Sequence, residues 1–205
     1  MGKRGAPTKR EASQKTIETR QRIRAVATQL FAECGYHATG VAELSTAVGL
    51  GVGALYYHIG SKEELLLDIC RSHIDDIVAV GEDLLRQDML AAEKIRRLAR
   101  RHMFNVAERT LELRVVMREI DSLTGTPRAE MQQLRDRTEE IWQEIVQQGK
   151  KSGEFENLDP LFVKLILGAL NYAVLWYRSN GELSPDEIAD RTVDLMLGIR
   201  KKAQV

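Results

Sequence analysis

The sequence predicts an all-α protein of about nine helices, in which a small N-terminal head of three helices precedes a larger helical body. In the 205 residues, every segment with a clear hydrophobic period has the period of a helix, and none alternates as a strand does. Residues 35–65 hold two segments of about seven residues joined by a glycine turn. Helices this short are unstable alone but have the right size for a helix-turn-helix.

The first helix is expected to begin near Thr19, after a mobile basic segment over residues 1–15, and to end at Gly35. Its apolar stripe, on which the next two helices pack, is Ile23, Val26, Ala27, Leu30, Phe31 and Cys34.

The two short helices follow at once. The first repeats apolar residues at Val41, Leu44 and Ala47, and Gly49 stops it. The second runs from about Val52 to His58. Ser61-Lys62-Glu63-Glu64 is a capping box that opens the next helix. We therefore divide the chain into a head, residues 1–60, and a body, residues 61–205.

Residues 35–65 resemble the TetR family of transcriptional regulators over about a dozen positions at fixed spacing. The matching residues are Gly35, Tyr36, Thr39, Leu44, Ala47, Gly49, Gly53, Leu55, Tyr56, Tyr57, Lys62, Glu64 and Leu65. Three positions depart: Gly40 and Gly51 stand where Ser or Thr usually caps a helix, and Ile59 replaces a usual Phe. Glycine is a tolerable N-cap that offers no side-chain oxygen.

The resemblance implies that the head binds double-stranded DNA with the helix from Val52 to His58 in a major groove. The candidate DNA contacts are Thr39, Gly40, Ser45, Thr46, Val52, Gly53, Ala54, Tyr56, Tyr57, His58 and Lys62. Because this helix carries no Arg, Asn or Gln, specificity should depend on apolar contacts, DNA shape and the basic arm. Leu55 and Ile59 are expected in the core, and on an alternative interpretation one of the tyrosines joins them.

The body continues with four helical segments. They run from Ser61 to about Leu85, over about 91–109, over about 111–123, and over about 127–151 with Pro127 at the first helical position and Gly153 at the end.

Two further helices should govern assembly. Asp159 and Pro160 start a helix over 161–177 that is apolar nearly all round, apart from Lys164 and Asn171. A capping box at Ser184 starts a last helix that reaches about Lys202. The resemblance implies that both helices pair with their copies in a homodimer, whereas a monomer with a buried central helix is the alternative.

In the family a small molecule binds among the helices of the body. The candidate lining residues are His102, Met103, Met117, Trp142, Asn171, Tyr172 and Trp176, which would favour a hydrophobic effector. The alternative is that most of them are plain core. Phe155, the helix after Asp159, the Trp176-Tyr177-Arg178 run and Gly181 resemble TetR regulators of sterol and fatty-acid catabolism, some of which respond to CoA thioesters.

Other kinds of site find little support. The glycines at 49, 51 and 53 follow no strand and precede no phosphate-loop Lys-Ser/Thr, which argues against a dinucleotide loop. Cys70 and His73 have helical spacing and could form half a metal site, but no second pair is visible, so a core Cys beside a buried His is preferred. No nucleophile-base-acid set is present, so we expect no enzyme activity, metal or cofactor.

Charge and targeting signals fit a DNA-binding protein of the cytoplasm. Residues 1–24 carry eight Lys or Arg against two Glu, while the whole chain has 30 of each sign. Such a basic arm suggests contact with nucleic acid, although a solvated tail is the alternative. No signal peptide or membrane span is recognised, and two cysteines give no disulfide framework.

The sequence therefore predicts a cytoplasmic, homodimeric TetR-type transcription regulator. We expect a repressor that leaves an inverted-repeat operator when a small hydrophobic effector binds, with an acyl-CoA or related catabolic intermediate as one such effector. The alternative is an all-helical ligand-binding or enzymatic protein that has kept the head and lost DNA binding. The departures at Gly40, Gly51 and Ile59 favour that alternative, and the basic arm with Tyr56, Tyr57 and Lys62 opposes it.

Overall fold

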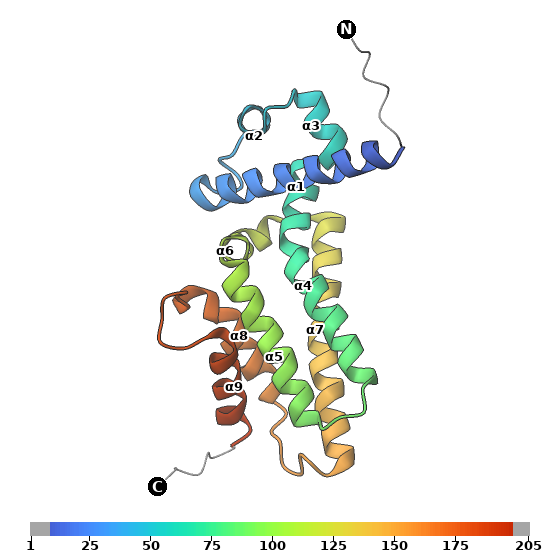
Figure 1. Ribbon diagram of the computed structural model, residues 1–205, viewed down its shortest axis with the longest axis vertical. Coiled ribbons are helices and arrows are strands. Elements are labelled where there is room, and N and C mark those ends of the chain that lie inside the picture. The colour runs from blue at the N-terminus through green and yellow to red at the C-terminus, as the bar shows by residue number, and fades with distance from the viewer. Residues whose placement is uncertain (1–8, 199–205) are drawn as a thin grey trace.

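The computed structural model describes residues 9–198, and their side chains from residue 14 onward. This part of the chain folds into nine α-helices and one short 3-10 helix and contains no strand, which confirms the predicted all-α class (Figure 1). The helices are α1 (Lys9–Cys34), α2 (Val41–Val48), α3 (Val52–Ile59), α4 (Lys62–Arg86), α5 (Ala91–Glu108), α6 (Thr110–Glu119), η1 (Ile120–Ser122), α7 (Gly125–Ser152), α8 (Phe162–Trp176) and α9 (Pro185–Met196).

The head, residues 1–60, contains α1, α2 and α3, and the first turns of α4 pack against it. In Figure 1, α1 lies across the top of the body. Helices α2 and α3 lie side by side above α1, on the side of α1 that faces away from the body. Ile23, Ala27 and Phe31 of α1 are fully buried against Leu44 of α2 and Leu55 of α3. The three helices thus bury one shared apolar core, which α2 and α3 could not form alone.

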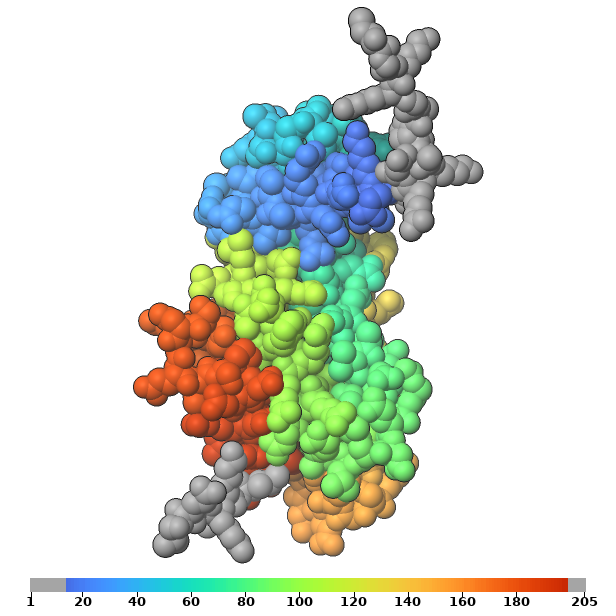
Figure 2. Space-filling model, viewed as in Figure 1, coloured from blue at the N-terminus to red at the C-terminus, as the bar shows by residue number. Residues whose placement is uncertain are grey.

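The body is a bundle in which α4 and α7 run side by side, α5 lies at the centre, and α8 and α9 cover one flank (Figure 1). Its core is centred on Trp142, the largest fully buried side chain. Close approach of α4 and α7 requires a glycine, because a Cβ at Gly81 would lie 2.6 Å from Cγ2 of Ile141. Figure 2 shows the head resting on the green segments of α4 and α6, and α9 on the outer surface of the body.

The head and the body share a boundary that no single residue marks. The head's apolar core includes residues of α4 between Leu65 and Ile74 and also Val115, Val116 and Met131 from α6 and α7. The division at residue 60 therefore stays a prediction, since packing continues across it.

The start of α1 was predicted wrongly. The helix begins at Lys9 rather than near Thr19, whose Oγ1 donates 2.8 Å to the Lys15 carbonyl inside the helix. Residues 9–15, expected to be mobile, are helical, and the basic residues at 3 and 4 lie outside the described part. Charged and polar residues with good helix propensity extend the helix toward the N-terminus. Because this part has no apolar stripe, the hydrophobic period did not predict it.

Three other helix ends differ from the predicted ones. Helix α7 begins at Gly125 after Thr124, so Pro127 is its third residue and not its first. Helix α8 begins at Phe162, because Asp159 caps a preceding turn in which its Oδ1 accepts from the Leu161 amide at 2.7 Å. Helix α9 ends at Met196 and not near 202, and Gly198 follows with a φ of +68°. Residues 199–202 lie outside the described part.

Helix α8 is apolar on two sides, of which its own chain covers one. Phe162, Val163 and Ile166 face the core, while Leu165, Tyr172 and Leu175 face outward and are exposed. The predicted burial on all sides is therefore not reached within one chain. Among the described helices, none is both long enough and apolar enough to cross a membrane.

Candidate DNA-binding head and effector site

The turn between α2 and α3 is set by local hydrogen bonds. Gly49 adopts a left-handed φ of +74° and closes α2 as predicted. Ser45 Oγ donates to the Leu50 carbonyl in a short contact, and Thr39 Oγ1 donates 2.9 Å to the Gly35 carbonyl just before α2. These bonds fix α3 at a set angle to α2 without a long loop.

Helix α3 presents a continuous outer face. Val52, Gly53, Ala54 and Tyr56 are exposed on it, and Tyr57 is 83% exposed. Leu55 and Ile59 point inward, as predicted. Both tyrosines face solvent, so the alternative that one of them joins the core is wrong. An exposed, largely apolar face with two phenol hydroxyls suits contact with thymine methyl groups and phosphates.

The residues predicted on α2 divide into two groups. Thr39 and Ser45 are buried and donate their hydroxyl hydrogens to carbonyls of the same turn, so their side chains hold the local fold. Gly40 and Thr46 are exposed at the two ends of α2. The Gly40 amide donates to Glu43 Oε2 at 3.3 Å, a weak substitute for a side-chain cap.

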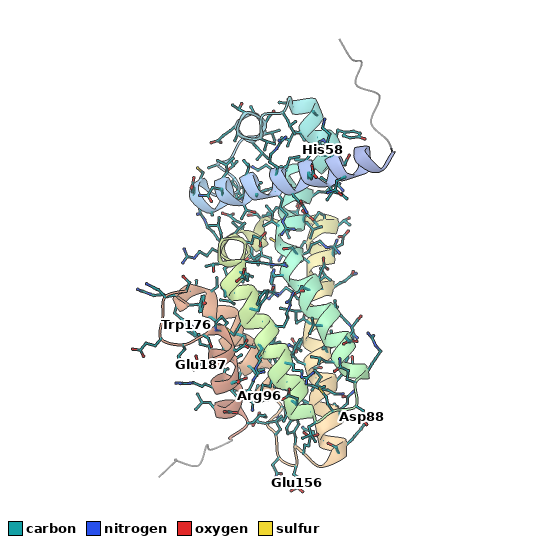
Figure 3. The ribbon with its side chains drawn as sticks, in the orientation of Figure 1. His58, Asp88, Arg96, Glu156, Trp176 and Glu187 are labelled. Carbon is teal, nitrogen blue, oxygen red and sulfur yellow. The ribbon has the colours of Figure 1, made fainter. Side chains whose placement is uncertain are left out.

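Arg20 of α1 supports the end of α3, a contact that sequence reasoning missed. Its Nε donates 2.8 Å to the carbonyl of His58, the residue labelled at the end of α3 in Figure 3. A cation at a helix C-terminus is favourable because the last carbonyls carry partial negative charge. The available signal was spacing, since Arg20 continues the line of Ile23 and Ala27 toward the N-terminus.

Lys62 begins α4 and lies between the head and α6. Its Nζ is 4.3 Å from the centroid of the Tyr36 ring, within the range of a cation–π contact. Partial burial lowers the pKa of Lys62, and the nearby Glu119 carboxylate opposes that shift. The ammonium is thus held at the rim of the head, on the side of the α4 N-terminus.

Helix α6 connects the head to the body through polar contacts. Glu119 is buried, and its Oε1 accepts from the Tyr36 amide at 3.2 Å. Arg24 of α1 pairs with Glu112 at 2.7 Å, and Ser122 Oγ lies 3.0 Å from His37 Nε2. A shift of α6 would therefore displace α1 and the residues that follow it through these contacts.

The predicted effector residues do not form one lining. Met103 and Trp142 are fully buried, and the Trp142 Nε1 has no hydrogen-bond partner. Met117, Tyr172 and Trp176 are exposed, with Trp176 at the outer end of α8 (Figure 3). His102 and Asn171 do meet: Nε2 of the first is 3.0 Å from Oδ1 of the second.

Two buried histidines of the body are held neutral. Burial lowers the pKa of His102 to about 4, and the hydrogen bond to Asn171 only partly offsets it. Burial, together with the nearby His102 and Arg109, also lowers the pKa of His73 to about 3. Both histidines favour the neutral ring in the folded chain.

These shifts predict acid sensitivity. Below the ordinary pKa of 6.5, the two histidines bind protons in the unfolded chain but stay neutral in the folded chain. The free energy of unfolding should therefore fall as the pH drops from about 6.5 toward 4. Each histidine can contribute up to about 1.4 kcal/mol per pH unit. In urea unfolding at pH 6.5 and 5, His102→Gln should reduce this dependence and exposed His37→Gln should not. An unchanged slope in the His102 variant would contradict the assignment.

The comparisons with known proteins agree with this geometry over nearly the whole chain. Residues 23–69 match the family described as bacterial regulatory proteins, tetR family, and residues 88–199 match the tetracyclin repressor-like C-terminal domain. The chain belongs to the TetR family. TetR regulators are DNA-binding proteins and not enzymes, which confirms the predicted family and class.

Individual relatives cover most of both chains. The HTH-type transcriptional repressor KstR2 of Mycolicibacterium smegmatis is 25% identical over 182 residues, 87% of this chain and 89% of that protein. The crystal structure of the TetR regulator PfmR from Thermus thermophilus is 35% identical with a TM-score of 0.79, over 88% and 100% of the two chains. The structure of AibR with isovaleryl coenzyme A and operator DNA has a TM-score of 0.75 at 24% identity, over 87% and 98%, and shows a shared fold.

Proposed function

We propose that this TetR-family protein is a repressor that binds an inverted-repeat operator as a homodimer and leaves it when a small hydrophobic effector enters the body. The observation that carries the DNA-binding part is the outer face of α3, where Val52, Tyr56 and Tyr57 stand exposed while Leu55 and Ile59 anchor the helix. Gly53 adds no side chain to this face, which allows a close approach to DNA. The contacting set we propose is Gly40, Thr46, Val52, Gly53, Ala54, Tyr56, Tyr57, His58 and Lys62.

The dimer is supported by the outer face of α8. Leu161, Leu165, Tyr172, Leu175 and Trp176 form an exposed apolar stripe at helical spacing. Gly168 lies in the middle of this stripe, and a Cβ added there would meet nothing of its own chain within 4 Å. A glycine inside a helix costs about 1 kcal/mol relative to alanine. Close crossing of a second copy of α8 would explain why this glycine is present.

The effector part is supported by the composition of the body and by one relative. The body's core is built from apolar side chains with a few buried polar groups among them, as in small-molecule sites. AibR was crystallised with isovaleryl coenzyme A, and KstR2 is named a repressor. An acyl thioester or related catabolic intermediate is the effector class that we propose.

The test of this function is selection of bound sequences from random DNA, followed by release with candidate effectors. We expect an enriched inverted repeat and displacement of the protein by acyl thioesters. No enriched sequence would instead support a ligand-binding protein that has lost DNA recognition.

Lys62 provides a sharper test of the interface. The ammonium carries no base information, so Lys62→Ala should weaken binding to all duplexes about equally and lower the salt slope by about one for each bound head. Lys62→Arg should retain binding, and Lys151→Ala, at the exposed end of α7 in the body, should have no effect. Gel-shift titrations at several salt concentrations measure this, and a loss confined to one sequence would show that Lys62 reads bases.

A further inference from the structure

Helix α5 carries two buried polar side chains one turn apart, each with one atom paired and one atom unpaired. His102 is 5% exposed and Asn105 is 0% exposed. His102 Nδ1 and Asn105 Oδ1 are buried and have no hydrogen-bond partner. Because residues three apart share a face of a helix, the two unpaired atoms belong to the same side of α5.

Both unpaired atoms are acceptors. The Asn105 Nδ2 donates 2.9 Å to Asp76 Oδ2 and 3.4 Å to the His73 carbonyl, and because both partners are acceptors the amide cannot be turned round. With the Asn171 amide placed so that its Oδ1 lies 3.0 Å from His102 Nε2, the oxygen accepts, so Nε2 carries the hydrogen and Nδ1 keeps its lone pair in the neutral ring.

A third unpaired atom lies on the facing helix. His73 Nδ1 of α4 is also buried with no partner at normal hydrogen-bond distance, the Cys70 backbone contacts the ring only weakly, and His73 lies near His102. Folded proteins pair about nine-tenths or more of such buried polar groups. Two unpaired acceptors three residues apart on α5 therefore call for a donor, which in a protein interior is either ordered water or a group of a ligand.

The surrounding charges restrict what that donor can be. Asp76 is engaged by Arg101 and by Asn105, and Arg109 donates 2.9 Å to the Ser72 carbonyl beside His73. An ammonium ion would meet two guanidinium groups against one carboxylate. A ketone or carboxylate would bring lone pairs to lone pairs. An uncharged hydroxyl brings no charge to the site and has a hydrogen to donate to an acceptor.

We propose that the effector carries a hydroxyl group, which donates its hydrogen to His102 Nδ1 or Asn105 Oδ1 at the centre of the body, while the rest of the molecule is apolar where it meets the core. This inference rests on the proposed effector function and names its ligand class: a hydroxylated acyl chain or ring. Asn171 connects this centre to the surface, since it is exposed on α8 and its Oδ1 lies 3.0 Å from His102 Nε2.

The experiment compares ligands that differ only at the hydroxyl. The N-acetylcysteamine thioesters of 3-hydroxydecanoic, 3-oxodecanoic and decanoic acid form one matched set, and decalol, decalone and decalin form a ring set. Calorimetry on the DNA-free protein should show the alcohol of at least one set binding about tenfold or more tighter than its ketone and its deoxy analogue, the size of one satisfied buried acceptor. Asn105→Leu and His102→Phe, each checked by circular dichroism, should reduce that preference, and Ile95→Val, a buried position on the same helix outside the candidate effector residues, should keep it.

The possible results are distinguishable. Equal affinity for the three members of both sets, or no binding by any of them, overturns the hydroxyl assignment. A crystal structure that shows a water retained on both acceptors beside a bound alcohol overturns it too. If ketone or deoxy compounds bind as well and still release DNA, the proposed function stands and this inference alone fails.

Discussion

Leu165→Glu should separate the proposed dimer into monomers and abolish tight operator binding. Leu165 lies in the middle of the exposed apolar stripe of α8 and is 58% exposed in the single chain. Burying one leucine contributes about 2 kcal/mol, and a two-fold interface loses it twice, so dissociation should become roughly a thousandfold easier. Burying a new carboxylate would add to that loss.

Sedimentation at micromolar concentration measures this effect, with Leu90→Glu as the matched control. Leu90 is also an exposed leucine, 66% exposed, but it precedes α5 and lies apart from the α8 stripe. Gly168→Leu is an independent variant, because a Cβ at this position would meet nothing of its own chain within 4 Å, and it should likewise give monomers. If α8 were a free surface, Gly168→Leu would raise helix stability and leave the molecular mass unchanged. A folded monomer for the wild-type protein would refute the interface.

Where the sequence predicted the structure well, the signal was local. Gly49 needs a left-handed φ, and Ser61 and Ser184 cap their helices with their own side chains, so each is decided within four residues. The inward and outward sides of α3 likewise follow from the alternation of Leu55 and Ile59 with polar or small neighbours.

The sequence was less informative where a helix lacks a local pattern, or where the same residue type in the same place suits either DNA contact or a local hydrogen bond. The first half of α1 has one large apolar residue, Ile17, which is exposed, and side-chain pairs such as Gln14–Glu18 accompany the helix where an apolar stripe is missing. Thr39 and Ser45 illustrate a signal shared by two roles: they were predicted as DNA contacts, and they are buried with their hydroxyl hydrogens on carbonyls of their own turn, so their contact with DNA stays a prediction.

The polar centre of the body could not be predicted from spacing at all. His73 and His102 are far apart in the chain, and their proximity depends on how α4 packs against α5. The same holds for Glu119, whose role under Tyr36 follows from the placement of α6 beneath the head. Such pairs are formed by tertiary packing, which a periodic pattern does not encode.

The proposed operator should depend on the distance between its two halves as strongly as on their sequence. Two heads related by a two-fold axis meet two half-sites related by the same axis, about one helical turn apart or a little more. Each head offers a two-turn helix without Arg, Asn or Gln, so a single half-site should bind weakly. Linking the two contacts in one dimer can strengthen binding by about 10²–10⁴, provided that both heads reach their sites.

Inserting half a helical turn, about 5 base pairs, at the centre of the selected operator should therefore remove that factor. The insertion turns one half-site to the opposite side of the duplex, where the second head, held by α4 and by the contacts of α6, cannot follow. Base changes in the spacer that keep its length are the control and should alter affinity little. Gel shifts on these three duplexes and on an isolated half-site measure the effect. Equal binding to an isolated half-site and to the full repeat would show that the two heads do not act together, and release by an effector would then need another explanation than a changed head separation.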